Sequence, residues 1–456
     1  MKNHRRQFLR LCGVAGVGTL AGCANSSGEQ TPTDEQTPTD EATESETVVE
    51  TDGNDRQRWK LVPNDDYTDD RDGSPIAISA DGTTAFVGAF SENQPDGEEV
   101  GSAYVFEAAG ESWSQVAKLT PSDGDSEAIV SHSMAVSDDG TTAIIGAPSD
   151  DNQNGDWAGS AYLFEAADGS WSQVAKLTAD DGDSEDIFGQ WVSVSGDGTT
   201  ALVGAPRDED PNGTDSGSAY VFEETSGSWS QRAKLTPDDG DSEDFFGNLV
   251  SLSSDGTTAI VGAVEDENPN GERAGSAYVF EQSSDGWHQR AKLTPDDGDA
   301  DDGFGTGLSL SSDGTTAIVG AYRDDNQNGT DSGSAYVFEA SGESWTQRRK
   351  LTPDDGDSGD KFGSGVDLSS DGTTAIVGAH DDDNQNGTDA GSAYVFETSG
   401  ESWTQRTKFT ADEVDSEDTF GFYVALSSDG TTAVVSVSRG DTPTDAGAAS
   451  AYVFEL

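Results

Sequence analysis

The chain has 456 residues, of which 88 are acidic and 24 basic, giving a formal net charge of −64. Self-repulsion of this size opposes a compact fold at low ionic strength, whereas molar salt shortens the screening length from about 10 Å to about 3 Å. The composition therefore predicts a protein of an extreme halophile. It argues against nucleic acid as a partner, since few cations are available to neutralise phosphates.

Residues 1–22 are expected to be an export signal. Arg5 and Arg6 form the twin-arginine pair of a Tat signal, and the apolar stretch 11–21 is too short to span a bilayer. The sequence LAGC at 20–23 resembles a lipobox, in which Cys23 becomes the lipidated first residue of the mature protein. The alternative is an ordinary secretory signal. The lipobox predicts an exported chain whose partner is the membrane, anchored to the outer face of the cytoplasmic membrane.

Residues 23–54 have the composition of a tether. They are rich in Thr, Pro and acidic residues, lack Lys and Arg, and contain almost no bulky apolar side chain. Such a segment cannot bury enough apolar surface to fold, so we expect a disordered linker.

The remainder, residues 55–456, is an array of near-identical units. The sequence DGTTA recurs at a constant interval of 58 residues, beginning at Asp81, Asp139, Asp197, Asp255, Asp313, Asp371 and Asp429. Seven units with a fixed period indicate a repeat architecture rather than separate domains.

Each unit is predicted to contain four strands. In one unit, the segment 246–254 alternates apolar and polar side chains at Leu249 to Leu252, and the hairpin signal Asp255-Gly256 precedes the continuous apolar run 257–263. Residues 276–281 are β-branched and aromatic, and residues 287–293 alternate again. Four-stranded units of this length are typical of β-propeller blades.

The chain ends predict how the ring closes. Residues 56–62 align with the last strand of a unit, whereas the chain stops after SAYVFEL, one strand short. We therefore expect an all-β, seven-bladed β-propeller in which the N-terminal strand completes the last blade. A lysine recurs on each outermost strand, where charge would protect an exposed edge.

These units resemble the FG-GAP repeat, the blade unit of integrin-α-type propellers. The motif reads FG, then VSLSSDGTTAIVGA, then GSAYVFE, although the first two units lack Phe-Gly and the seventh has VVSVS in place of the GA motif. The resemblance implies a propeller that often holds calcium in its first hairpin. Here that hairpin is the short SSDGTTA, so the family's calcium ligands cannot be transferred to it.

A second loop offers another candidate for calcium. Oxygen ligands at positions 1, 3 and 5 with Gly at 6 are how a calcium loop wraps a cation, but the Glu of position 12 is missing here. The alternative is an Asx-turn in a solvated loop. The candidate ligands are Asp150, Asn152, Asn154, Asp208, Asp210, Asn212, Asp266, Asn268, Asn270, Asp324, Asn326, Asn328, Asp382, Asn384 and Asn386.

Positions that vary between units point to the centre of one face. In a propeller, the loops after the second strand and between blades emerge on the same face, and both are acidic here. Aromatic side chains beside polar loops suit recognition of a sugar or peptide, and the alternative is interblade packing. The candidate mouth residues are Trp191, Phe422, Tyr423, Tyr322, His380 and His132.

The sequence favours a binding protein over an enzyme. His132, His288 and His380 occupy three different repeat positions, so no metal cluster or Ser-His-Asp set is evident. We expect an adhesion or scaffold propeller of the cell surface, with an envelope protein or glycan as partner and no certain cofactor. A carbohydrate-binding module is the alternative, and a polysaccharide hydrolase is the third reading.

Overall fold

The computed structural model describes residues 49–51, 57–64, 75–89, 101–122, 132–400, 402–411, 414, 416, 418–438 and 450–456. Arg5, Arg6 and Cys23 lie outside the described residues, as does the predicted linker up to residue 48. Every regular element in the described ranges is a strand, so none of them is a helix able to cross a membrane.

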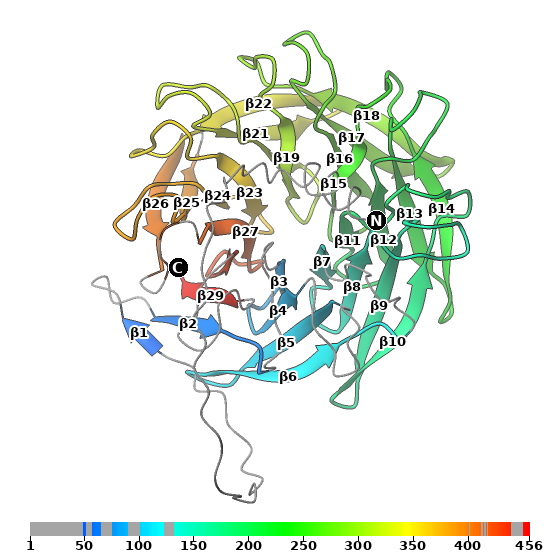
Figure 1. The fold of residues 1–456 in the computed structure, drawn as a ribbon, viewed down its shortest axis with the longest axis horizontal. Coiled ribbons are helices and arrows are strands. Elements are labelled where there is room, and N and C mark those ends of the chain that lie inside the picture. Colours follow the sequence, from blue (N-terminus) through cyan, green and yellow to red (C-terminus); the bar gives the residue numbers. More distant parts are fainter. Residues whose placement is uncertain are drawn as a thin grey trace, which may run out of the picture. The chain divides into compact units, whose positions relative to one another are not determined.

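The strands form seven antiparallel sheets arranged as the blades of a ring (Figure 1). Around the centre lie β3 (Ile76–Ile78), β7 (Met134–Val136), β11 (Val192–Val194), β15 (Phe246–Leu252), β19 (Phe304–Leu310), β23 (Phe362–Leu368) and β27 (Phe420–Leu426). The second strands are β4 (Thr84–Ala89), β8 (Thr142–Ala147), β12 (Thr200–Ala205), β16 (Thr258–Ala263), β20 (Thr316–Ala321), β24 (Thr374–Ala379) and β28 (Thr432–Val437).

The outer two strands of each blade complete its sheet. The third strands are β5 (Ser102–Ala108), β9 (Ser160–Ala167), β13 (Ser218–Glu224), β17 (Ser276–Ser283), β21 (Ser334–Ser341), β25 (Ser392–Ser399) and β29 (Ser450–Glu455). The outermost strands are β6 (Trp113–Leu119), β10 (Ser170–Leu177), β14 (Trp229–Leu235), β18 (Gly286–Leu293), β22 (Ser344–Leu351), β26 (Ser402–Phe409) and, in the seventh blade, β2 (Gln57–Leu61). The predicted all-β, seven-bladed propeller is confirmed.

The N-terminal strand closes the ring as predicted. β2 pairs antiparallel with β29, with Lys60 opposite Tyr452 and Leu61 opposite Ala451. Outside it, β1 (Val49–Thr51) pairs with β2 and makes this sheet five-stranded. The prediction of a disordered linker through residue 54 is wrong for these three residues. Their β-propensity and the open edge of β2 explain the additional strand.

Glycines set the spacing between neighbouring blades. A Cβ on Gly320 in β20 would lie 1.9 Å from the carbonyl oxygen of Gly363 in β23, so only glycine allows this approach. The same close contact joins Gly204 to Gly247. The Gly of the GA motif in one blade therefore packs on the Gly of the Phe-Gly motif in the next blade, which explains why the two motifs recur together.

Each interblade core combines side chains of two neighbouring blades. Phe246 packs edge-on against Tyr278 and Phe280, with ring centroids 5.6 and 5.8 Å apart, and the same cluster includes Leu202 and Val221 of the preceding blade. These side chains are at most 3% exposed. Because a blade buries its apolar faces only between two neighbours, the ring stabilises every blade.

A closed cycle of backbone hydrogen bonds surrounds the ring axis at the end with the short Asp-Gly hairpins. In each bond the N–H of one blade donates to the carbonyl of the next, at 2.8–3.1 Å. Since seven links return to the first residue, the innermost ends of all seven blades are joined. The cycle runs through Ala80, Asp138, Gly196, Ser254, Ser312, Ser370 and Ser428, which donates to Ala80.

Candidate binding face

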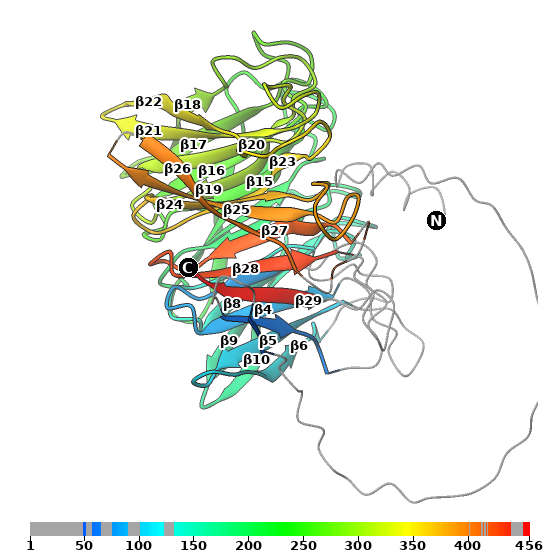
Figure 2. The same cartoon turned by 90° about the vertical axis from the view of Figure 1, so that its left-hand side faces the viewer.

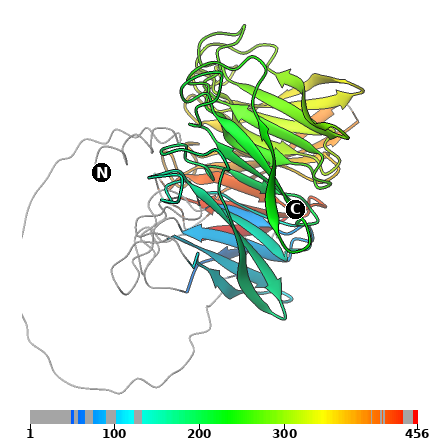
Figure 3. The ribbon, with the colours of Figure 1, turned by 90° about the vertical axis from the view of Figure 1, so that its right-hand side faces the viewer.

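The longer loops gather on one side of the ring, as the side views show (Figures 2 and 3). We call this side the loop face. It comprises the loops after the second strands, 148–159, 206–217, 264–275, 322–333 and 380–391, and the interblade segments 178–187, 236–245, 294–303 and 352–361. Acidic residues recur in both kinds of segment, as the sequence predicts.

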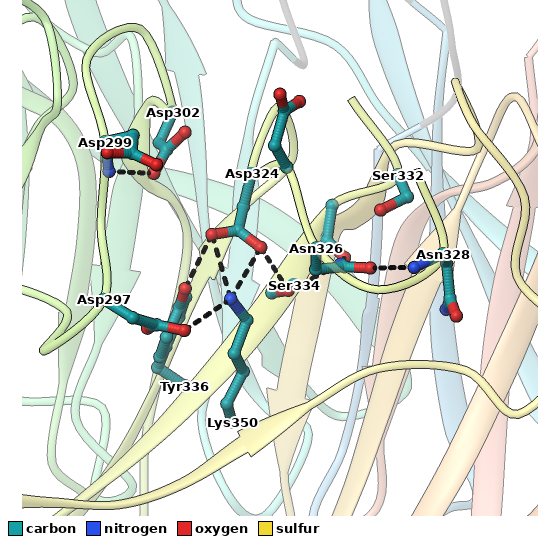
Figure 4. A network of polar contacts seen from close by, with 12 residues as sticks. Asp297, Asp299, Asp302, Asp324, Asn326, Asn328, Ser332, Ser334, Tyr336 and Lys350 are labelled. Atoms are coloured by element: carbon teal, nitrogen blue, oxygen red, sulfur yellow. Dashed lines mark hydrogen bonds and ion pairs between the residues drawn. The ribbon is translucent and has the colours of Figure 1, made fainter. Parts of the chain in front are cut away.

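The first Asp of each candidate calcium loop is buried inside a polar network. In the fifth blade, Asp324 is 1% exposed and accepts hydrogen bonds from Tyr336 (2.8 Å) and Ser334 (2.7 Å). The ammonium of Lys350 lies 2.9 Å from its Oδ2 and 2.8 Å from Oδ2 of Asp297 in the preceding interblade segment (Figure 4). The same ammonium lies 5.3 Å from the centroid of the Tyr336 ring. A cation therefore already neutralises the carboxylate.

This buried ion pair recurs around the ring. The repeated lysine is about one fifth exposed, so it bridges two blades rather than only shielding an edge, as its position had suggested. The equivalent pairs, with N···O distances of 2.8–3.0 Å, are Asp150–Lys176, Asp208–Lys234, Asp266–Lys292 and Asp382–Lys408.

The other two candidate ligands hold the loop together. The Oδ1 of Asn326 accepts the N–H of Asn328 at 2.8 Å, which is an Asx-turn, and its Nδ2 donates to the Gly333 carbonyl at 2.7 Å. Asn328 donates to the Pro353 carbonyl of the next interblade segment at 3.0 Å. The same turn forms at Asn152–Asn154, Asp210–Asn212, Asn268–Asn270 and Asn384–Asn386.

These contacts do not fit a calcium site. The side-chain oxygens of positions 1 and 3 already have different partners, and an ammonium lies beside the first carboxylate, where a cation would bind. Among the described residues, no group of three or more His, Cys, Asp and Glu side chains could hold one metal ion. The structure shows the Asx-turns of the alternative prediction.

A second buried carboxylate lies beside each of these networks. Asp302 is 4% exposed and accepts the N–H of Asp299 at 2.6 Å. Burial raises its pKa to about 6, and the nearby carboxylates of Asp324 and Asp299 contribute to the rise. Burial likewise raises the pKa to about 6 or 7 at the equivalent Asp186, Asp244 and Asp360. Burial in the folded ring therefore makes these carboxyl groups harder to ionise than exposed ones.

Four predicted mouth residues form one continuous aromatic cluster, which we call the aromatic arc. Trp191 of the third blade stacks on Tyr423 of the seventh, with centroids 6.0 Å apart and planes at 25°. Tyr423 contacts Phe422 at 4.9 Å, and Phe422 contacts His380 at 5.0 Å. All four rings are partly exposed. The stack brings together residues from blades that are not neighbours in the ring.

The remaining two predicted mouth residues behave differently. The guanidinium of Arg323 lies 4.7 Å from the centroid of the Tyr322 ring, and the ammonium of Lys361 lies 5.7 Å from the same centroid. His132 is 5% exposed, and its Nδ1 lies 2.9 Å from the Gln190 carbonyl. Burial lowers the pKa of His132 to about 4. The prediction that His132 lines the mouth is therefore wrong, because its ring is packed between two blades.

Three charged residues that do not recur in every blade were not predicted from the sequence. Arg323 and Lys361 place positive charge on the acidic face, and Asp367 stands where the other blades have Ser or Ala. Asp367 accepts hydrogen bonds from the Ser309 hydroxyl (2.7 Å) and the Leu426 N–H (2.8 Å), so it links three blades. Aligning the seven units would have found Lys361 and Asp367, which do not recur, whereas Arg also stands at the position of Arg323 in the third and seventh units, as Arg207 and Arg439.

The family comparison agrees with this architecture. The FG-GAP repeat matches seven consecutive segments, residues 56–106, 113–164, 171–222, 229–280, 287–338, 345–396 and 403–454. The chain belongs to the FG-GAP repeat family. Each FG-GAP match begins on the outermost strand of one blade and ends in the third strand of the next, because the interblade core is the repeating unit.

The FG-GAP motifs themselves serve packing. Their glycines make the interblade contacts and their Phe fills the core, whereas the aromatic arc uses positions that differ between repeats. A comparison with curated proteins gives no match to this FG-GAP protein. What the loop face binds must therefore be argued from the residues that are not shared by the repeats.

Proposed function

We propose that this chain is an exported, lipid-anchored binding propeller on the cell surface of an extreme halophile, acting in adhesion or as an envelope scaffold. The observation that carries the proposal is the contrast between the repeated networks and the aromatic arc. Residues shared by the blades fix the loops, whereas residues that vary gather at the mouth. The twin arginines and Cys23 support export and anchoring.

The loops are well suited to present a fixed surface. Each second-strand loop is tied to the next interblade segment, as Asn328 is to Pro353 and Asn270 is to Pro295, with N···O distances of 3.0 and 2.9 Å. The repeated lysines add a second contact between blades, an ion pair such as that of Lys350 with Asp297. A surface held in this way loses little conformational entropy when it binds a partner.

A carbohydrate is the favoured alternative to a protein partner. Sugar rings stack on aromatic faces beside polar groups, and the aromatic arc offers four partly exposed rings next to acidic loops. A hydrolase is less well supported, because the recurrent buried carboxylates of the described residues are engaged by Lys, Tyr and backbone groups. We therefore propose a non-catalytic binding role.

The experiment is retention of isolated envelope by the purified mature chain in molar KCl. A Phe422→Ser/Tyr423→Ser variant should lose retention while keeping the wild-type far-UV circular dichroism spectrum. Arg348→Gln, a charge change on the outer rim, is the control and should retain it. Prior periodate treatment of the envelope removes a glycan partner, and protease treatment removes a protein partner. Undiminished retention by the double variant would refute a binding role for the arc.

A Cys23→Ser chain tests the anchor separately. The wild-type chain should sediment with membranes and partition into detergent, whereas the variant should be released into the medium. Equal sedimentation of the two chains would exclude the lipid anchor without bearing on the binding role.

A further inference from the structure

Most cations of the described residues lie on the outermost strands and have partners there. The lysines bridge the buried carboxylates, and the first arginine of these strands pairs with a Glu of the adjacent strand, for example Arg348 with Glu339 at 2.9 Å. The equivalent arginine pairs are Arg232–Glu223, Arg290–Glu281 and Arg406–Glu397. Most of the cations on the outermost strands are therefore already paired with carboxylates, in ion pairs that recur from blade to blade.

The loop face carries a few cations that do not recur in every blade, and among the described residues two of them, Arg207 and Arg323, have no ion pair. Arg273 pairs with Asp301, and Lys361 lies 3.3 Å from Asp331. Arg323, by contrast, has no carboxylate within 4.0 Å among the described residues, and its guanidinium rests on Tyr322. In a chain of net charge −64, an arginine that stays unpaired among acidic loops is available to an anion from outside.

Arg323 and Lys361 lie beside the aromatic arc. The Lys361 ammonium and the Arg323 guanidinium both lie over the ring of Tyr322. The carbonyl of Asp360, next to Lys361 in the chain, accepts the N–H of Asp381 at 3.3 Å. The neighbouring His380 is the first ring of the arc, so the cations and the rings form adjacent parts of one surface.

We propose that Arg323 and Lys361 bind the anionic group, a carboxylate or sulfate, of an acidic glycan whose sugar rings lie on the aromatic arc. The inference rests on the proposed carbohydrate-binding role and names its ligand class. The planar guanidinium can donate two parallel hydrogen bonds to a carboxylate or sulfate, and the lysine supplies a second charge. The Tyr322 ring holds the guanidinium in place before the ligand arrives, which lowers the entropic cost of binding.

A packing role makes a different prediction. If Arg323 only packs on Tyr322, removing its charge should change the stability of the protein. The protein should then bind charged and neutral ligands equally well, with or without Arg323. Arg323→Gln keeps much of the side-chain stem over the ring and removes the charge, as does Lys361→Gln for the ammonium. Arg348→Gln is the matched control, because it makes the same substitution on the rim and changes the net charge equally.

The test is calorimetric titration of the mature chain in molar KCl with paired oligosaccharides. Each uronate oligosaccharide is compared with its carboxyl-reduced form, and each sulfated one with its desulfated form. The wild type and Arg348→Gln should bind the best charged member roughly tenfold more tightly than its neutral partner. Arg323→Gln and Lys361→Gln should each lose most of this preference while binding the neutral member with unchanged affinity.

Other results would overturn the inference in distinguishable ways. Equal binding of charged and neutral members would remove the anionic subsite and leave carbohydrate binding intact. A charge preference that survives in both variants would place the subsite elsewhere. Binding of no oligosaccharide, together with envelope retention that is abolished by protease and insensitive to periodate, would reject the acidic glycan and retain a protein partner for the loop face.

Discussion

At the residue scale, charges that recur in the blades and charges that occur once have different surroundings. The recurrent Asp324 has an ammonium beside it, whereas Asp367 is held by the Ser309 hydroxyl and two backbone N–H groups. Burial raises the pKa of Asp367 to about 6, above the ordinary value of 3.8. The two carboxylates therefore depend on different neighbours, an ammonium for Asp324 and neutral donors for Asp367.

Asp367 should make the folded ring less stable as pH rises. Because its pKa is higher in the folded than in the unfolded chain, its stabilising effect is complete below about pH 4 and is lost as pH passes 6. The difference corresponds to at most about 3 kcal/mol. Denaturant titrations in molar KCl should show a smaller fall between pH 4 and 7 for Asp367→Asn than for wild type. Asp238→Asn, at an exposed position, should reproduce the wild-type slope; equal slopes for all three chains would contradict the assignment.

Removal of one recurrent lysine should leave a buried carboxylate without its counter-ion. We expect Lys350→Met to lower the free energy of unfolding by about 2–4 kcal/mol, since Asp324 is 1% exposed. Arg348→Met removes a neighbouring ion pair that is about half exposed and should cost less than about 1 kcal/mol. Denaturant unfolding in molar KCl measures both. Similar losses for the two variants would mean that the buried pair contributes no more than a surface pair.

At the element scale, the sequence predicts the strands well because each is repeated seven times. The predicted runs 257–263 and 276–281 correspond to β16 and β17 within two residues at each end. β1 was not predicted, because three residues carry too little periodicity and their pairing depends on β2. The choice between calcium loop and Asx-turn was also open, because the lysine that meets the first Asp comes from the outermost strand.

The interblade glycine contact should tolerate no side chain. Gly320 has an ordinary backbone conformation, so Gly320→Ala tests crowding alone, and its Cβ would lie 1.9 Å from the Gly363 oxygen. We expect a loss of about 3 kcal/mol or more in the free energy of unfolding. Gly342→Ala introduces a Cβ with no neighbour within 4 Å but with a φ of +64°, and should cost about 1 kcal/mol. The reverse order of the two losses would show that the blades can separate to admit the methyl group.

At the scale of the whole molecule, closure creates contacts that no single repeat contains. Trp191 and Tyr423 belong to the third and seventh blades, and only the completed ring stacks them. The sequence places both toward the loop face but gives no indication that they touch. The ligand mouth was therefore predicted as a set of residues, and its arrangement as one arc came from the structure. Arg323 and Lys361 beside it were not predicted as site residues, and the structure places both over the Tyr322 ring.

Stability of the ring should depend on the N-terminal strand. Trp59 of β2 is 4% exposed, and its Nε1 donates to the Glu111 carbonyl at 2.9 Å, so β2 also contacts the first blade. A chain that begins after Leu61 should unfold at lower denaturant concentration than one that begins at residue 49, in molar KCl. Starting the chain at residue 49 should leave the midpoint of the full mature chain unchanged. Equal midpoints for all three would show that closure does not require β2.

The cycle of seven backbone hydrogen bonds around the ring axis also bears on chain connectivity. Every link runs in the same direction, from the N–H of one blade to the carbonyl of the next, and the last returns to Ala80. The polypeptide has two ends, but this cycle has no first or last member. A circularly permuted chain, cut in any interblade segment and joined at its present termini, would therefore conserve all seven links, with every blade then made of one continuous piece.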